Sequence, residues 1–152
     1  MTALSYRAAL SADLPFLVDL LSIDYVGSPT DGWTDATAPR YEAALRAIDA
    51  DPNNELFVAV LEDLTIGTFQ LTFLPGIMRA GMWRGLIESV HVVPEQRNKG
   101  YGGEMMRWAI ERCRERGCGL VQLTSNKQRL DAHRFYRMLG FEQSHEGFKL
   151  FL

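Results

Sequence analysis

The sequence has few cysteines and no long apolar stretch. Only two of its 152 residues are cysteine, Cys113 and Cys118, and neither belongs to a CxxC pair or lies near a pair of histidines. This usage argues against a disulfide-stapled secreted domain and against a zinc site, so we expect two reduced thiols and no metal. No window approaches the roughly 20 apolar residues of a membrane span, and the first residues lack a signal-peptide layout. We therefore expect a cytoplasmic protein with no membrane partner.

The chain also lacks internal repeats and low-complexity tracts. Hydrophobic residues make up 47% of it, which is enough for a substantial core at this length. The composition therefore predicts a single domain over residues 1–152.

Charged residues are distributed unevenly. Residues 1–63 hold eleven acidic residues against three arginines, whereas residues 95–137 hold ten basic residues against five acidic ones. This uneven charge distribution would suit an anionic partner for residues 95–137 and a cationic partner for residues 1–63. Solvated helix faces are the alternative explanation. The net charge of −3 argues against nucleic acid as a partner.

Helix and strand patterns alternate along the chain. Ser11 is a candidate N-cap, and Gly117 and Gly140 are candidate helix stops. The segment 22–39 is rich in Gly, Pro, Asp and aromatic residues, which is typical of a ligand-contacting loop. Helices are expected at 11–21, 39–50, 100–116 and 131–139, and strands at 4–9, 56–61, 66–74, 83–93, 120–124 and 148–152. This order predicts an α/β (α+β) fold, with helices on the faces of a mixed sheet.

The most informative stretch runs from Ile87 to Gly103, where a strand leads through a basic, glycine-rich turn into a helix. Helix N-termini present unpaired N–H groups and the positive end of the helix dipole, and glycines let a phosphate approach the backbone. The spacing fits neither a P-loop nor a dinucleotide fingerprint. An anion site and a plain glycine-stopped loop both remain open from this stretch alone.

Two motifs together carry a family resemblance. The run Arg97-Asn-Lys-Gly-Tyr-Gly102 resembles the RxxGxG/A signature of the GNAT superfamily of acetyltransferases, and the preceding strand ends in the pattern V-x-V-x-P. Further on, Ala132 to Phe141 resembles the second marker, A-x-x-x-Y-x-x-x-G-F. The resemblance covers nearly the whole chain, although its first half is generic.

This resemblance implies a fold and a cosubstrate. The sheet is expected to be mixed, mostly antiparallel, of six to seven strands, splayed at a β-bulge, with about four helices on its faces. Acetyl-CoA is expected in the splay, and no metal is required. Backbone groups of the strand would bind pantetheine, and N–H groups of the turn would bind the pyrophosphate. The expected cofactor-binding residues are Val90, His91, Val92, Arg97, Asn98, Lys99, Gly100, Tyr101, Gly102, Gly103 and Asn126.

Two side chains are the catalytic candidates. An amine must lose a proton before it attacks, and Glu88, two residues before Val90, could accept it directly or through water; pairing with Arg84 or plain exposure is the alternative. The resemblance places the Tyr136 hydroxyl at the sulfur of coenzyme A, where it would protonate the leaving thiolate. Otherwise Tyr136 is a half-buried core residue. The N–H of Val92 could stabilise the oxyanion.

The sequence departs from the family at Arg129, where Asn is frequent. Asn126, expected to end a strand, could supply the missing amide contact or cap a turn, and Lys127 and Arg129 could contact the 3′-phosphate of the cofactor. His91 and His133 show no partner in the sequence and are expected to be structural or exposed rather than bases.

The acceptor is expected to be the primary amine of a small molecule, with a protein or peptide amine as the alternative. Three aspartates in the loop Asp24–Asp35 would favour a cationic amine or could be a solvated turn. A non-catalytic acyl-CoA-binding regulator and a transferase for a longer acyl group are the rivals. The apolar segment Phe148–Leu152 could join a homodimer interface.

Overall fold

The structure is a computed structural model of the chain, and it describes residues 3–23 and 31–152. The chain divides into two compact units, Met1–Gln122 and Leu123–Leu152. The single domain expected from the composition stays a prediction.

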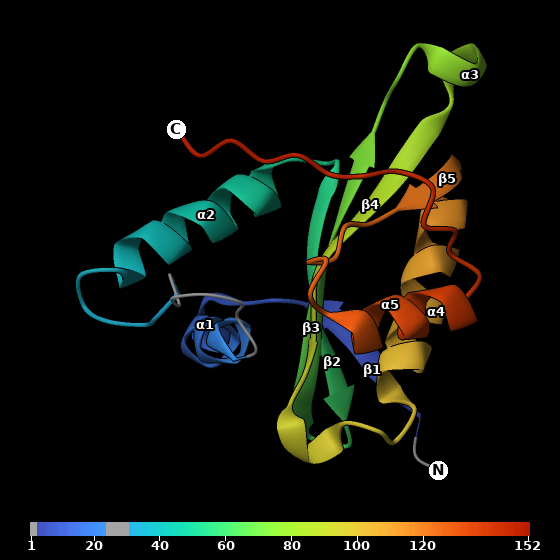
Figure 1. Cartoon of the computed structure of the whole chain (residues 1–152). Coiled ribbons are helices and arrows are strands. Elements are labelled where there is room, and N and C mark those ends of the chain that lie inside the picture. Colours follow the sequence, from blue (N-terminus) through green and yellow to red (C-terminus); the bar gives the residue numbers. More distant parts are fainter. Residues whose placement is uncertain (1–2, 24–30) are drawn as a thin grey trace. The chain divides into compact units, whose positions relative to one another are not determined.

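One sheet organises the first unit (Figure 1). Its strands lie in the order β1-β2-β3-β4-β5, and neighbours are antiparallel except for the parallel pair β4 and β5. The strands are β1 (Ser5–Ala8), β2 (Asn54–Leu61), β3 (Leu64–Leu74), β4 (Trp83–Val92) and β5 (Cys118–Gln122). The predicted mixed, mostly antiparallel sheet is confirmed, but it has five strands over the described residues rather than six to seven.

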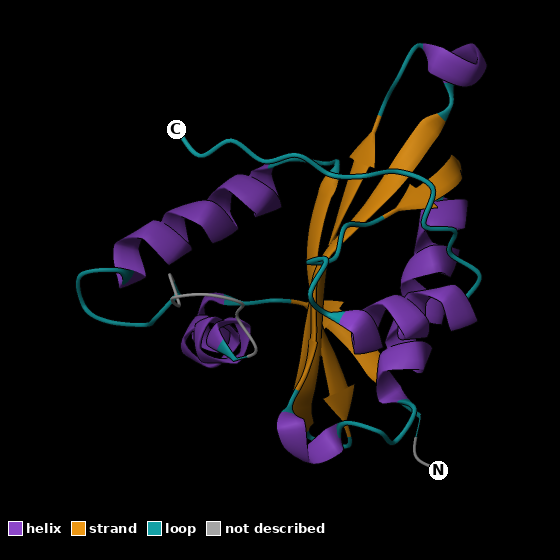
Figure 2. Ribbon diagram, viewed as in Figure 1, coloured by secondary structure: helices purple, strands orange, loops and turns teal. Residues whose placement is uncertain are grey.

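Helices cover both faces of this sheet. Figure 2 shows α1 and α2 on one side of the strands and α4 on the other, within the first unit. The helices of this unit are the 3-10 turn η1 (Ser11–Asp13), α1 (Leu14–Ser22), α2 (Ala38–Ala50), α3 (Met78–Gly81), the 3-10 turn η2 (Pro94–Gln96) and α4 (Tyr101–Glu115). The second unit contains α5 (Leu130–Met138). The short α3 turn between β3 and β4 was not predicted.

The core between α4 and the sheet is tightly packed. Trp108 of α4 stacks on Tyr6 of β1 with ring centroids 4.5 Å apart. The buried residues of the same helix on this side include Met105, Met106, Ala109 and Cys113. At Gly67 of β3, a Cβ atom would lie 2.7 Å from the His91 carbonyl oxygen and 2.9 Å from the Met105 sulfur. Glycine is therefore required there because strand and helix approach each other too closely for a side chain.

The opposite face packs α1 and α2 against the sheet. Leu14, Leu17 and Leu45 form a buried cluster with Val58 of β2. The helical spacing of the α1 residues was read correctly from the sequence, because an amphipathic helix must bury one stripe.

The cap predicted at Ser11 is wrong. The carboxylate of Asp13 accepts a hydrogen bond from the Leu10 N–H at 2.7 Å. It also accepts hydrogen bonds from the two terminal nitrogens of Arg7, at 2.7 and 2.8 Å. These hydrogen bonds lower the pKa of Asp13. The ionised carboxylate takes the capping role because it satisfies a backbone donor and an arginine together.

The final strand predicted at 148–152 is also wrong. Its alternating apolar residues favour a strand, yet residues 141–152 form no ladder with any described segment. Phe148 is 94% exposed. Alternation gives only the tendency, and a strand exists only where a neighbour supplies its hydrogen bonds.

Candidate active site

A β-bulge interrupts β4 at Ser89. Thr68 of β3 pairs with His91, and Gln70 pairs with Glu88, so the single residue Phe69 faces two residues of β4. Ser89 itself has φ +54°, a left-handed value that is uncommon for a residue other than glycine. The bulge predicted from the family resemblance is therefore present, and it lies in the strand where it was expected.

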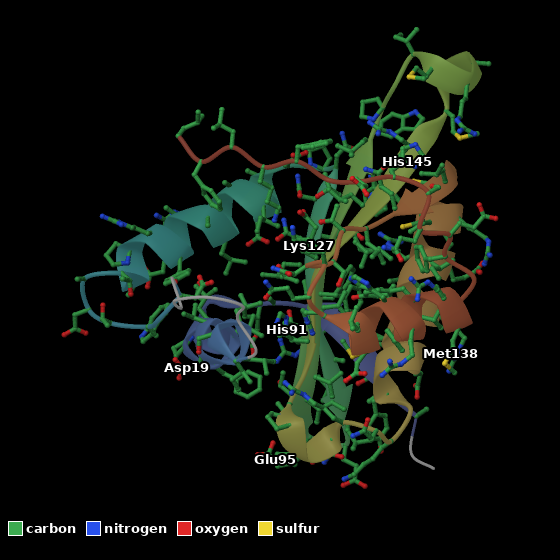
Figure 3. All side chains as sticks on the ribbon, in the orientation of Figure 1. Asp19, His91, Glu95, Lys127, Met138 and His145 are labelled. Atoms are coloured by element: carbon green, nitrogen blue, oxygen red, sulfur yellow. The ribbon has the colours of Figure 1, made fainter. Side chains whose placement is uncertain are left out.

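The bulge changes which side chains share a face. Cross-strand partners lie on the same face of a sheet, so Glu88 lies with Gln70 and His91 lies with Thr68. Residues three apart would face opposite sides in a regular strand, yet Glu88 and His91 share one side. Figure 3 shows His91 on the side of the sheet that faces α1. Asp19 in the same figure points from α1 away from the sheet.

Beyond the bulge, β4 continues without β5. The parallel pairing of the two strands ends with Leu86 opposite Gln122, and no other described segment pairs with this side of Ile87–Val92. The Val93 N–H donates to Ile66 of β3 at 2.8 Å. Because neighbouring residues of a strand direct their hydrogen-bonding groups to opposite sides, the N–H of Val92 points away from β3.

The turn after β4 leads directly into α4. Asn98 and Gly100 have left-handed φ values of +59° and +88°, and Gly100 is directly followed by the first turn of α4. The first N–H groups of a helix have no partner within the helix. Left-handed residues before such a terminus gather several N–H groups into a concave anion site. The sequence prediction of an anion site at residues 98–103 therefore gains a suitable backbone geometry.

The basic side chains of the turn differ in what they do. Arg97 is partly buried, and its Nε donates to the Val92 carbonyl at 3.0 Å, which fastens the turn to the end of β4. Lys99 is exposed and reaches Gln96 at 3.0 Å. The ring of Tyr101 is only 8% exposed and belongs to the core. Among these three side chains, Lys99 is therefore the one placed to add charge for a bound anion.

A cavity of about 130 Å³ lies between the sheet and the helices α1 and α2. Its walls come from four residues of each helix, and its floor contains Leu56, Thr68, Gln70 and Ser89. No charged side chain lines it among the residues that the structure describes. Ser89, the bulge residue of β4, thus lines the cavity. From Ile87 onward, the side of β4 that faces away from β3 pairs with no described segment.

The loop before α2 is held against this cavity by hydrogen bonds. The Tyr41 hydroxyl donates to Asp31 at 3.0 Å and accepts the Gly32 N–H at 3.2 Å, and the Tyr41 ring lines the cavity. Burial raises the pKa of Tyr41. Trp33 stacks on Tyr41 with ring centroids 6.0 Å apart. Asp35 is exposed, and Asp24 of the predicted cationic-amine loop lies outside the described residues.

Glu88 is exposed beside the cavity. Its alternative role as the partner of Arg84 is not supported, because Arg84 donates instead to Gln122 at 3.3 Å. No ion pair or hydrogen bond of the Glu88 carboxylate occurs among residues 3–23 and 31–152. Glu88 is the cross-strand partner of Gln70, a cavity residue.

In the second unit, Tyr136 is half-buried on α5. Its ring centroid lies 5.3 Å from that of Phe135 and 6.1 Å from that of Phe141. Burial raises the pKa of Tyr136, and the positive charge of Arg129 partly offsets this. The phenol therefore keeps its proton at neutral pH, as a general acid must.

Asn126 caps a turn. Its side-chain oxygen accepts the Gln128 N–H at 3.0 Å, and its carbonyl oxygen lies 2.9 Å from Nε2 of His133. This favours the turn-capping alternative of the two considered from the sequence. The prediction that Asn126 ends a strand is wrong, because β5 ends at Gln122. His133 has a structural partner, as expected for a residue that is not a base.

Sequence reasoning did not identify Gln70, Thr68 and Tyr41 as site residues. No motif marks them, because they reach the cavity only through pairing of distant strands and packing of α2. The bulge did leave a signal: the apolar residues Ile87 and Val90 are three apart, which breaks the two-residue period of a strand.

Comparisons with known proteins agree with this geometry. Residues 14–141 match the model of the acetyltransferase (GNAT) family. The chain is 35% identical over 98 residues to an aminoalkylphosphonate N-acetyltransferase of Salmonella typhimurium, a match covering 64% of this chain and 63% of that protein. It is 33% identical over 115 residues to a streptothricin acetyltransferase of Streptomyces lavendulae, covering 74% and 54%. Each match thus spans less than two thirds of the relative.

A solved structure is similar over almost its whole length. It is a transcriptional regulator from Bacillus halodurans C-125, with a TM-score of 0.92 and 41% identity, covering 98% of this chain and 99% of that one. The family match, the β4 bulge and the turn before α4 lead to one conclusion: this chain belongs to the acetyltransferase (GNAT) family.

Proposed function

We propose that the protein transfers an acetyl group from acetyl-CoA to the primary amine of a small molecule. One observation carries the proposal: Ser89, at the bulge of β4, lines an apolar cavity, and the same strand leads into the glycine-rich turn before α4. The open edge of β4 begins beside this bulge, so two substrates could meet along one strand.

The cosubstrate side consists mainly of backbone. The N–H groups of residues 98–103 would hold the pyrophosphate, with Lys99 adding charge. The backbone edge of Val90–Val92 would hold the pantetheine arm, and the outward N–H of Val92 would polarise the thioester carbonyl. The left-handed Asn98 and Gly100 support this assignment because left-handed residues in a turn are typical of concave anion sites.

Glu88 would act on the acceptor side. An alkylamine with a pKa near ~10.4 is neutral in only about one molecule in 10³ to 10⁴ at pH 7. Glu88 would take the ammonium proton directly or through water, leaving the nitrogen lone pair free to attack the thioester carbon. Its place opposite Gln70, at the cavity, supports this role.

Tyr136 would complete the reaction. A C–N bond forms and the C–S bond breaks, so the sulfur leaves with the electron pair and needs a proton. Tyr136 would donate this proton, since its raised pKa keeps the hydroxyl protonated at neutral pH. The ammonium proton held by Glu88 passes to solvent. After the attack the nitrogen carries one proton more than the amide product, and this second proton would pass through water to the Tyr136 phenolate. The acid is thereby restored, and the transfer releases one proton overall.

The relatives favour small molecules as acceptors. Two of them are named for acetylation of aminoalkylphosphonate and of streptothricin, and the cavity of about 130 Å³ has the scale of a small organic group. No helix in the described parts of the chain is long and apolar enough to cross a membrane. A cytoplasmic location and a homodimer stay predictions.

A coenzyme-A-binding regulator is the second candidate. The observation that favours it is the 41% identity to a protein named as a transcriptional regulator. The retained Glu88 and Tyr136 favour catalysis instead, because a regulator has no need of a base or an acid.

Calorimetric titration with acetyl-CoA, followed by thiol-release assays with a panel of amines, tests both candidates. Binding with thiol release for some amine is the expected result. Binding without release from any amine would favour the regulator, and no binding would overturn the proposed function.

A further inference from the structure

The side chain of Gln70 is oriented by a chain of hydrogen bonds that starts at Asp51. The Asp51 carboxylate accepts the Asn53 N–H at 2.8 Å and the Asn54 side-chain Nδ2 at 2.7 Å. These bonds lower the pKa of Asp51, so it stays ionised and can only accept. Asn54 must therefore direct its NH₂ group to Asp51 and its oxygen toward β3.

This arrangement fixes the direction of the Gln70 amide. The Asn54 oxygen accepts from Gln70 Nε2 at 3.2 Å and from the Thr72 hydroxyl at 2.8 Å. Since an oxygen must face a donor, the nitrogen of the Gln70 amide is committed to Asn54. The carbonyl oxygen of Gln70 is left at the other end of the amide, and no hydrogen bond to it is found within the described residues.

Gln70 lines a cavity whose walls are mostly apolar. Thr68 also lines the cavity, but its hydroxyl already donates a hydrogen bond to the Phe57 carbonyl at 2.8 Å. The remaining walls are mainly aliphatic residues of α1 and α2, which lie on this side of the sheet (Figure 1). A phosphonate or a carboxylate would lose its hydration here with no cation to pair with in the described lining, and a second ammonium group would find no carboxylate there.

The size of the cavity limits the acceptor further. An apolar cavity of about 150 Å³ in another protein accommodates benzene, and the cavity here measures about 130 Å³. A small ring or a short branched alkyl chain therefore matches the space. Ala44 of α2 lines the cavity and is itself exposed.

We propose that the acceptor is a primary amine on an uncharged hydrocarbon body of about this size, and that the Gln70 carbonyl oxygen accepts a hydrogen bond from its nitrogen. This inference rests on the proposed function and names its substrate class. Gln70 is thereby a positioning and specificity residue next to Glu88, which removes the proton.

Steady-state kinetics with matched amines test the substrate class. The acceptors are benzylamine and 3-methylbutylamine, against 2-aminoethylphosphonate and putrescine, each with saturating acetyl-CoA. The hydrocarbon amines are expected to have a kcat/KM at least about ten-fold higher than either charged amine. A higher kcat/KM for the phosphonate or the diamine would overturn the inference while leaving the proposed function intact.

Binding is measured separately from transfer. Benzylamine is titrated calorimetrically into the protein saturated with coenzyme A, at a pH where the amine is partly neutral. Saturable binding is expected even if transfer fails, in which case only the proposed function is overturned. Absence of benzylamine binding would overturn the inference.

Two variants locate the contact. Gln70→Leu is expected to raise the KM for benzylamine about ten-fold, with acetyl-CoA affinity unchanged, whereas Gln143→Leu, at an exposed glutamine of the second unit, should behave as wild type. Ala44→Leu, an exposed substitution that narrows the cavity, should lower kcat/KM for benzylamine more than for methylamine. Equal effects on both amines, or an unchanged KM in Gln70→Leu, would refute the placement.

Discussion

Replacing Gly100 by alanine should weaken acetyl-CoA binding without removing any side-chain contact. Gly100 has φ +88° and ψ −8°, and a Cβ atom built on it meets nothing within 4 Å. The added methyl group therefore causes no clash and acts only through the backbone. Left-handed backbone costs an L-residue roughly 1–2 kcal/mol, so the unbound turn is expected to relax.

Binding would have to restore the left-handed turn. A cost of roughly 1–2 kcal/mol corresponds to about a 5- to 30-fold loss of affinity. Calorimetric titration with acetyl-CoA measures this loss directly. Thermal unfolding of the same sample shows how much of the cost appears as lost stability instead.

Gly117 provides a matched control at the other end of the same helix. It follows the end of α4, has φ +80°, and also has nothing within 4 Å of a built Cβ. Gly117→Ala should therefore lower the free energy of unfolding by the same roughly 1–2 kcal/mol but leave acetyl-CoA affinity unchanged. Wild-type affinity in Gly100→Ala, or equal losses in the two variants, would refute the assignment of this turn as the pyrophosphate site.

Three further predictions concern the catalytic groups and the core. Tyr136→Phe should lower kcat about 10²-fold or more at unchanged acetyl-CoA affinity, and a full-rate variant would remove Tyr136 from its role. Because burial raises the pKa of Tyr136, the wild-type enzyme should not lose this acid below about pH 10. Glu88→Gln should lose rate at pH 7 and recover as the pH approaches the amine pKa, and a loss independent of pH would contradict a base there. Gly67→Ala should reduce the free energy of unfolding, measured by urea titration, by about 1–3 kcal/mol. The reason is that the added Cβ would meet the His91 carbonyl oxygen and the Met105 sulfur. Wild-type stability of the variant would show that helix and strand can separate at low cost.

The parts of the fold that sequence predicted well are those encoded locally. The helix α4 was found because its buried stripe, its N-terminal glycines and its stop at Gly117 all lie within one short segment. Gly117 and Gly140 both adopt the left-handed conformation expected after a helix. Each of these signals is decided by neighbours a few residues away.

The parts that sequence missed depend on distant partners. The strand expected at 148–152 has the right alternation but no ladder, and Gln70 gains its orientation only from Asn54 on the neighbouring strand and, through it, from Asp51. The bulge position was present as a break in periodicity at Ser89 but acquires meaning only once Phe69 is known to face it. Long-range pairing of this kind has no fixed spacing in the chain.

The extra residue at Ser89 also determines how substitutions along β4 would be tolerated. Before it, the odd-numbered Gly85 faces α4, since a Cβ there would meet Cys113. Beyond it, the even-numbered Val92 does so, because it pairs with Gly67, whose built Cβ meets Met105. A mutational scan of the strand should therefore show intolerance at odd positions that passes to even positions after residue 89. Deleting Ser89 would leave Glu88 opposite Gln70 and His91 opposite Thr68, so it would restore a regular strand and keep the side chains on both sides of the bulge on their present faces.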